Sequence, residues 1–168
     1  MEQLYGYGVF HFSWGFLQVS ARFNRTLSND LSKFYHSKYA ITVNSWTSGL
    51  ITAVGAIGVE PGDEIIVTPW TMCASATAIL HWNAIPVFSD IEPETFCLDV
   101  NSVEANITSK TKAIFHNHYC GYLGEIEAMN ALGKEFGIPV IDDCIEAFGS
   151  ELNGKKTGNL GTDITVFS

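Results

Sequence analysis

The chain has 168 residues, of which 46% are hydrophobic and 16% charged, so it has ample apolar material for a packed core and is not a disordered protein. Eighteen acidic residues against nine basic ones leave a net charge of −9, which excludes a general binder of nucleic acid or anionic membranes, because both partners require a surplus of Lys and Arg. No apolar run approaches the roughly 20 residues of a membrane helix and no basic secretory signal opens the chain, so these features predict a cytoplasmic protein of one domain.

The chain opens with an aromatic segment that fits no predicted element. Beyond it, Ser28 is predicted to cap a helix that carries Leu31, Phe34 and Tyr35 on one face. Six of the 21 aromatic residues lie within the first 16 positions: Tyr5, Tyr7, Phe10, Phe12, Trp14 and Phe16.

Short apolar runs then alternate with helical stretches as far as the end of the chain. The runs predict strands at residues 39–43, 64–68, 85–89, 112–117, 138–142 and 163–167. Helices are predicted at residues 47–58, 71–81, 102–107 and 125–136, and a hairpin at 151–158 around Asn153-Gly154. Nearly continuous apolar strands are typical of a parallel sheet that is covered on both faces. The sequence therefore predicts a three-layer α/β fold, with a mostly parallel sheet and flanking helices.

Neither metal chemistry nor disulfides are expected. His116 and His118 alternate on one predicted strand and can face the same side, but no third ligand stands at a suitable spacing, so histidines of the core or of a loop are favoured. The glycine motifs of P-loop and Rossmann nucleotide sites are absent, which disfavours a nicotinamide-binding hypothesis. Widely spaced cysteines without a CxxC pair indicate buried free thiols: Cys73, Cys97, Cys120 and Cys144.

Polar side chains follow several predicted strands, at the sheet edge where ligands bind in open α/β folds. Residues 44–50 open a helix with small hydroxyl side chains. These either offer N–H groups to a phosphate or simply cap the helix, as Ser45 or Thr47 would. Ser168 follows the final strand, and its hydroxyl either binds a phosphate or belongs to a frayed end.

A pair of carboxylates ends the strand predicted at 138–142. Strand alternation sends Asp142 and Asp143 to opposite faces, so they are not a dyad that shares a proton. One carboxylate at this position either holds the protonated ring nitrogen of a pyridine cofactor or braces a loop.

Taken together and in this order, these segments carry a family resemblance. It rests on four stretches between about Ser28 and Ser168: NSWTSGL, VEPGDEIIVTPWTMCASATAILHWNAIPVFSDIEPETFCLD, TKAIFHNHYCG and IPVIDDCIEAFGSELNGKKTGNLGTDITVFS. In them the chain resembles the DegT/DnrJ/StrS sugar aminotransferases, pyridoxal 5'-phosphate (PLP) enzymes of the aspartate-aminotransferase fold type. The resemblance implies that residues 28–168 are the N-terminal part of the PLP-binding large domain of fold type I, which is incomplete here, and that residues 1–27 are a separate segment.

The resemblance also assigns residues to a cofactor site. Thr47, Ser48 and Ser168 would hold the phosphate of PLP. Asp143 would be the catalytic carboxylate that bonds the pyridine nitrogen and keeps it protonated. Met72 would cover the face of the pyridine ring, where the family often has an aromatic side chain.

Two further positions follow from the same resemblance. Glu146 lies where the family commonly carries Gln or His near the phenolic oxygen of the cofactor, so an ionised acid there would put negative charge beside a phenolate. His118 and Gly121 match a His-x-x-Gly motif, which places His118 on the substrate side.

The family's Schiff-base lysine follows the phosphate-binding serine by five positions, a point beyond Ser168, and none of the seven lysines of the chain stands in that context. The resemblance therefore implies a fragment that is inactive alone. The complete enzyme would be a homodimer that transfers an amino group, expected from glutamate, to a nucleotide-linked keto-sugar. Two alternatives stay open: a non-catalytic short homologue that binds PLP or phosphate or acts as an interaction partner, and a dehydratase of the same family in which another residue replaces the lysine.

Overall fold

The computed structural model describes residues 17–168, with side chains from residue 25 onward. The aromatic residues of the N-terminal segment lie outside the described residues. Among the residues described, no helix combines the length and the apolar character needed to cross a bilayer.

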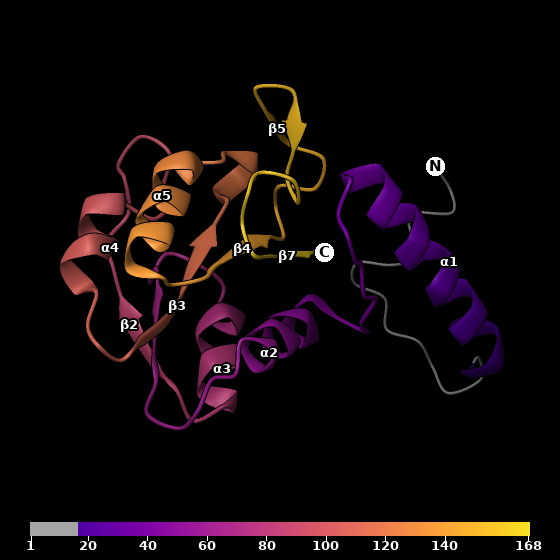
Figure 1. Cartoon of the computed structure of the whole chain (residues 1–168), viewed down its shortest axis with the longest axis horizontal. Helices are drawn as coiled ribbons and strands as arrows, with labels where there is room; N and C mark the ends of the chain where they lie inside the picture. Colours follow the sequence, from indigo (N-terminus) through magenta and orange to yellow (C-terminus); the bar gives the residue numbers. More distant parts are fainter. Residues whose placement is uncertain (1–16) are drawn as a thin grey trace.

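Five parallel strands form the central sheet, in the order β2-β1-β3-β4-β7 (Figure 1). The strands are β1 (Glu64–Val67), β2 (Ile85–Phe88), β3 (Thr111–Asn117), β4 (Val140–Cys144) and β7 (Ile164–Phe167). Since β1 pairs with both β2 and β3, the strand order changes direction between β1 and β3. A short antiparallel hairpin, β5 (Glu151–Leu152) and β6 (Lys155–Lys156), stands apart from this sheet.

Helices cover both faces of the sheet and make three layers. The pair α2 (Trp46–Ala56) and α3 (Cys73–His81) covers one face, and α4 (Val100–Asn106) with α5 (Ile126–Phe136) covers the other (Figure 1). Strand alternation divides the core accordingly: Ile65, Val67 and Phe115 pack beneath α2 and α3. Ile66, Ile114 and Val140 pack beneath α4 and α5.

Helix α1 (Leu17–Tyr35) belongs to neither layer and lies beside the sheet, as the indigo helix of Figure 1 shows. Its last residue, Tyr35, is buried and stacks on Phe167 of β7, with ring centroids 4.5 Å apart. The prediction that Ser28 caps this helix is wrong, because Ser28 lies within α1, where its hydroxyl is 3.4 Å from that of Thr42.

Helix α2 begins where the sequence predicts. Ser45 is its N-cap, with an extended backbone and a hydroxyl that accepts the N–H of Ser48 at 3.1 Å. The helix lies close against β7 at Gly49, since a Cβ atom there would stand 2.7 Å from Cγ1 of Val166. The start of α2 is therefore held against the strand that ends at Phe167.

Five of the six predicted strands, the four helices after α1 and the hairpin are confirmed, with shifts of a few residues at some ends. The strand predicted at 138–142 begins two residues later, because the N–H of Ile138 closes helix α5 by donating to Gly133 and Pro139 has no N–H to give. The helix predicted at 102–107 starts instead at Val100, after the cap Asp99.

Two further predictions from the sequence are wrong. Residues 39–43 form no strand but link α1 to α2, and Tyr39 and Ile41 are three-quarters exposed because no strand pairs with them. All four cysteines are free thiols, as expected, but only Cys97 and Cys144 are buried. Cys73 and Cys120 are exposed because they stand in segments that follow strand ends.

Candidate functional site

A cavity of about 380 Å³ opens beyond the carboxyl ends of β1, β3 and β4. Its walls come from residues 69–72 after β1, residues 117–119 at the end of β3, Trp46 at the start of α2, and three residues at the end of β4: Asp143, Ile145 and Glu146. The change of strand direction between β1 and β3 makes this the position where open α/β sheets bind ligands. Its volume lies in the range of small-molecule sites.

Asp143 supplies a buried carboxylate to this cavity. It is 2% exposed and comes from β4, and its two oxygens have different donors. The indole N–H of Trp46 donates to Oδ1 at 2.7 Å, and the hydroxyl of Ser75 donates to Oδ2 at 2.9 Å. The predicted division of the two aspartates is confirmed, because Asp142 instead meets His118 and Thr162 on the other face.

The charge of Asp143 lacks a strong cationic partner. Burial raises the pKa of this carboxyl from 3.8 to about 6, although the hydrogen bonds from Ser75 and Trp46 oppose the shift. In the part of the chain that the structure describes, no Lys or Arg forms an ion pair with it. A ligand with a protonated ring nitrogen would supply the missing positive charge and use the acceptor capacity that the carboxylate retains.

Three residues of this site were not predicted from the sequence. Trp46 and Ser75 hold Asp143, and Asn117 lines the cavity with a buried amide oxygen that has no partner among the described residues. Asn117 could have been found, since it ends a strand directly before His118. Ser75 and Trp46 carry no such signal, because they lie on helices and reach Asp143 only in the folded chain.

The residues predicted to hold a phosphate lie close to the cavity rather than in its wall. Thr47 and Ser48 form the first turn of α2, next to the cavity residue Trp46, and Ser168 follows β7, the strand on which α2 packs. The N–H of Ser48 is engaged by the cap residue Ser45. The start of a helix nevertheless attracts anions, because its N–H groups and its dipole point outward.

Met72 and Glu146 both line the cavity. Met72 precedes α3 and is 63% exposed, so its thioether is available to cover a ring. Glu146 is exposed, and its Oε2 accepts the backbone N–H of Cys120 at 2.6 Å. The carboxylate thus holds the loop after β3, in which Cys120 has the left-handed backbone conformation, with φ at 50°.

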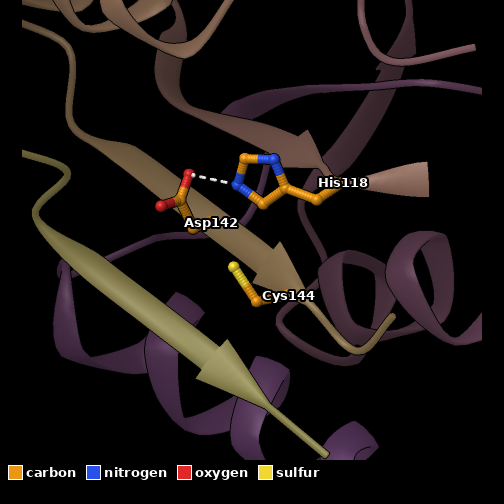
Figure 2. Close-up of side chains that lie close together, drawn as sticks. All are labelled: His118, Asp142 and Cys144. Carbon is orange, nitrogen blue, oxygen red and sulfur yellow. Dashed lines mark ion pairs between the residues drawn. The ribbon is translucent and has the colours of Figure 1, made fainter. Parts of the chain in front are cut away.

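Behind the cavity, His118 meets two side chains of β4 that share its face (Figure 2). His118 is buried and lines the cavity, and its Nε2 lies 3.3 Å from Oδ1 of Asp142. The hydroxyl of Thr162 donates to the other oxygen of Asp142 at 2.9 Å. Nε2 of the imidazole therefore faces Asp142 rather than the cavity, and this contact holds the ring of His118 in place.

The thiol of Cys144 also points toward this pair, and one ligand atom from each of His118, Asp142 and Cys144 falls within 4.8 Å of the others. The fold therefore brings Asp142 and Cys144 close to His118 as possible metal ligands, which the spacing in the sequence did not indicate. Burial, reinforced by the neighbouring carboxylates of Asp142 and Asp143, raises the pKa of the Cys144 thiol well above its usual value. Because Asp142 pairs with His118 and Cys144 lies beside that pair, we interpret the group as a support for His118.

Aromatic rings stand at the mouth of the cavity. Trp70 and Tyr119 line it, and Phe96 contacts both, with ring centroids between 5.8 and 6.2 Å apart. Trp70 and Phe96 are nearly half exposed. These rings give the site an apolar rim around its polar floor.

Comparisons with known proteins agree with this geometry. The family model described as the DegT/DnrJ/EryC1/StrS aminotransferase family matches residues 14–168. The match begins ahead of Ser28, and helix α1 runs without interruption across positions 27 and 28. GDP-perosamine synthase from Vibrio cholerae is 36% identical over 154 residues, which are 92% of this chain and 42% of the relative.

Solved structures give the same result. The structure of 3-amino-5-hydroxybenzoic acid synthase superposes with a TM-score of 0.82 and 29% identity, over 86% of this chain and 37% of that one. The PLP form of Spr1654 from Streptococcus pneumoniae superposes with a TM-score of 0.80 and 30% identity, over 86% and 41% of the two chains. The chain thus spans about two fifths of the length of these relatives and has their parallel-sheet α/β fold over that part.

Proposed function

Because the chain belongs to the DegT/DnrJ/EryC1/StrS aminotransferase family, we propose that its 168 residues form the cofactor-binding part of a PLP-dependent sugar aminotransferase. The reaction we propose moves an amino group from an amino acid, glutamate, to the keto group of a nucleotide-linked sugar. The observation that supports it most is the buried carboxylate of Asp143, which stands at the cavity without a strong cationic partner among the described residues.

Bound PLP supplies a protonated pyridine ring that withdraws electrons from the reacting carbon. In our proposal Asp143 holds the proton at the ring nitrogen, and Met72 covers one face of the ring. Thr47, Ser48 and Ser168 take the phosphate at the start of α2. His118 faces the substrate side, braced by its pairing with Asp142.

A transaminase also needs an amine at the cofactor's reactive carbon, and no lysine is among the residues that line the cavity. We propose that the 168 residues bind the cofactor but do not catalyse transamination by themselves. Treating the chain with PLP and borohydride should therefore label no single lysine preferentially. Stoichiometric labelling of one lysine, mapped by peptide mass spectrometry, would contradict this part of the proposal.

The decisive experiment is a titration with pyridoxamine 5'-phosphate, which has no aldehyde and so does not react with surface lysines. We expect saturable binding of one molecule per chain, measured by calorimetry. Pyridoxamine, which lacks the phosphate, should bind at least 10-fold more weakly, because it forgoes the charged contacts at the start of α2. A chain that binds neither compound would refute the proposed function.

Glu146 should weaken cofactor binding through its charge. Replacing it by Gln keeps an oxygen for the N–H of Cys120 but removes a negative charge beside the proposed position of the phenolic oxygen. We expect Glu146→Gln to bind pyridoxamine 5'-phosphate roughly 3- to 10-fold more tightly, from the Coulomb energy of two charges about 4 Å apart in a wet site. The exposed Glu125→Gln is the control, and equal affinities for both variants would argue against this placement of Glu146.

Further parts of the proposal concern the whole protein. We propose that it works as a homodimer in the cytoplasm, with nucleotide-sugar and amino-acid substrates. We also propose that residues 28–168 are the part of the PLP-binding domain present here. The apolar rim of Trp70 and Phe96 offers surface that a partner subunit or a substrate would cover.

A further inference from the structure

We propose that Trp46 is a positioning residue that sets the distance between the two ends of the cofactor site. The inference rests on the proposed function, because it concerns how the same cavity would hold PLP. Its starting point is a single side chain that joins a helix start to a carboxylate 97 positions further along the chain.

The contact itself is buried and short. Trp46 is 5% exposed, and its Nε1–H donates to Oδ1 of Asp143 at 2.7 Å. Ser75 donates to the other oxygen at 2.9 Å, so the carboxylate is held from both sides by α2 and α3. A carboxylate held at both oxygens cannot turn freely, and it keeps acceptor capacity for a ligand.

The backbone of Trp46 belongs to the other end of the site. It is the first residue of α2, and the next two residues, Thr47 and Ser48, are those proposed to take the phosphate. Helix α2 cannot readily shift, because Gly49 lies directly against Val166 of β7. The indole therefore connects a fixed helix start to the carboxylate opposite it.

PLP carries its phosphate on a short arm from a ring carbon two positions away from the nitrogen, so a site that binds both groups must keep its two anchors within a narrow range of separations. The side chain of Trp46 contacts the first anchor, Asp143, and its backbone begins helix α2, the second anchor. The N–H also stabilises the charged form of Asp143, which is the form that a protonated ring nitrogen requires.

The test compares two identical substitutions. Trp46→Phe removes the indole N–H that donates to Asp143. Trp82→Phe removes an indole N–H that donates to the carbonyl of Ile51, which lies in α2 but away from the cavity. We expect Trp46→Phe to weaken binding of pyridoxamine 5'-phosphate about 10- to 100-fold, as for a lost hydrogen bond to a charged group. Trp82→Phe should stay within about twofold of the unaltered chain.

A pH profile separates positioning from a general packing defect. Affinity should fall as acid protonates Asp143, and the midpoint of this fall should move to higher pH in Trp46→Phe but not in Trp82→Phe. Both variants keep the other titratable groups near Asp143: Asp142, His118, Cys144 and Glu146. Weaker binding with an unmoved midpoint would reduce Trp46 to a packing residue and overturn the inference.

A measurement on the unaltered chain keeps the inference testable if Trp46→Phe fails to fold. With ¹⁵N-labelled tryptophan, one indole N–H resonance should shift with a midpoint near pH 6 and lose this response in Asp143→Asn. No responsive indole would disprove the contact. If the unaltered chain binds no cofactor, the proposed function and this inference are both refuted. If the unaltered chain and Trp46→Phe bind it equally well, the inference alone is refuted.

Discussion

Replacing Asp143 by Asn should stabilise the chain at pH 8 by about 3 kcal/mol and remove its affinity for pyridoxamine 5'-phosphate. Burial raises the pKa of this carboxyl from 3.8 to about 6, so the folded state binds a proton more readily than the unfolded state between these values. Ionising the group above pH 6 therefore costs folding free energy, about 1.4 kcal/mol for each pKa unit. Asn avoids this cost, keeps an oxygen for Trp46, and can donate to the hydroxyl of Ser75.

Urea unfolding at pH 8 and pH 4 tests this expectation. The advantage of Asp143→Asn over the unaltered chain should shrink to under about 1 kcal/mol at pH 4, where the buried carboxyl is protonated. Asp30→Asn, on the exposed surface of α1, serves as the control and should show no such trend. If the advantage of Asp143→Asn did not depend on pH, the buried carboxyl would not be the source of the cost.

Replacing His116 by Gln should remove a loss of folding stability that the unaltered chain suffers in acid. This effect is similar in size to that of Asp143, but it changes with pH in the opposite direction. Burial lowers the pKa of His116 from 6.5 to about 4, and the nearby His118 adds to the shift. Below pH 6.5 the unfolded chain binds a proton that the folded chain refuses, so stability is lost as the pH falls toward 4, by about 3 kcal/mol. Gln does not titrate and retains an N–H near the carbonyl of Leu123, which the imidazole contacts at 3.1 Å.

The measurement is the change in unfolding free energy between pH 7.5 and pH 4. The unaltered chain should lose about 3 kcal/mol more over this interval than His116→Gln, whatever the two stabilities are at pH 7.5. His81→Gln, at an exposed position in α3, should behave like the unaltered chain. Equal losses in the chain and in His116→Gln would mean that His116 is protonated within the folded protein.

These two groups oppose one another in the unaltered chain. Between pH 4 and pH 6, Asp143 makes the fold less stable as the pH rises, while His116 makes it more stable. Their contributions are similar in size, so together they add little net slope to the pH profile of the unaltered chain. The two variants should therefore reveal opposite slopes that the parent profile hides.

The layered fold could be predicted from the sequence because buried parallel strands leave a strong signal. Most strands of the sheet carry a short apolar run, and alternate residues such as Ile65 and Ile66 face the two helical layers. The prediction fails where a segment forms a strand only if a neighbouring strand pairs with it. Residues 39–43 have a strand-like apolar pattern, but no neighbour in the sheet accepts them, and nothing in their own sequence records this.

The site divides in the same way. The strand pattern could predict only that a carboxylate at this strand end lies where ligands bind, and the family resemblance then selected Asp143. Trp46 and Ser75 could not be predicted, since their contact with Asp143 joins positions 97 and 68 residues apart and leaves no periodic pattern in the chain. Cys144 joins His118 and Asp142 for a similar reason, because only the pairing of β3 with β4 brings them together.

The change of direction in the strand order has a kinetic consequence. Strands β2 and β1 build one side of the sheet, and β3, β4 and β7 build the other. The cavity lies across this boundary, with Met72 from the first side and Asp143 from the second. A molecule held between them links both sides of the sheet, so both must separate from it before the sheet can open. Ligand occupancy should therefore lower the rate at which the chain unfolds and slow its digestion by proteases, in addition to shifting the folding equilibrium.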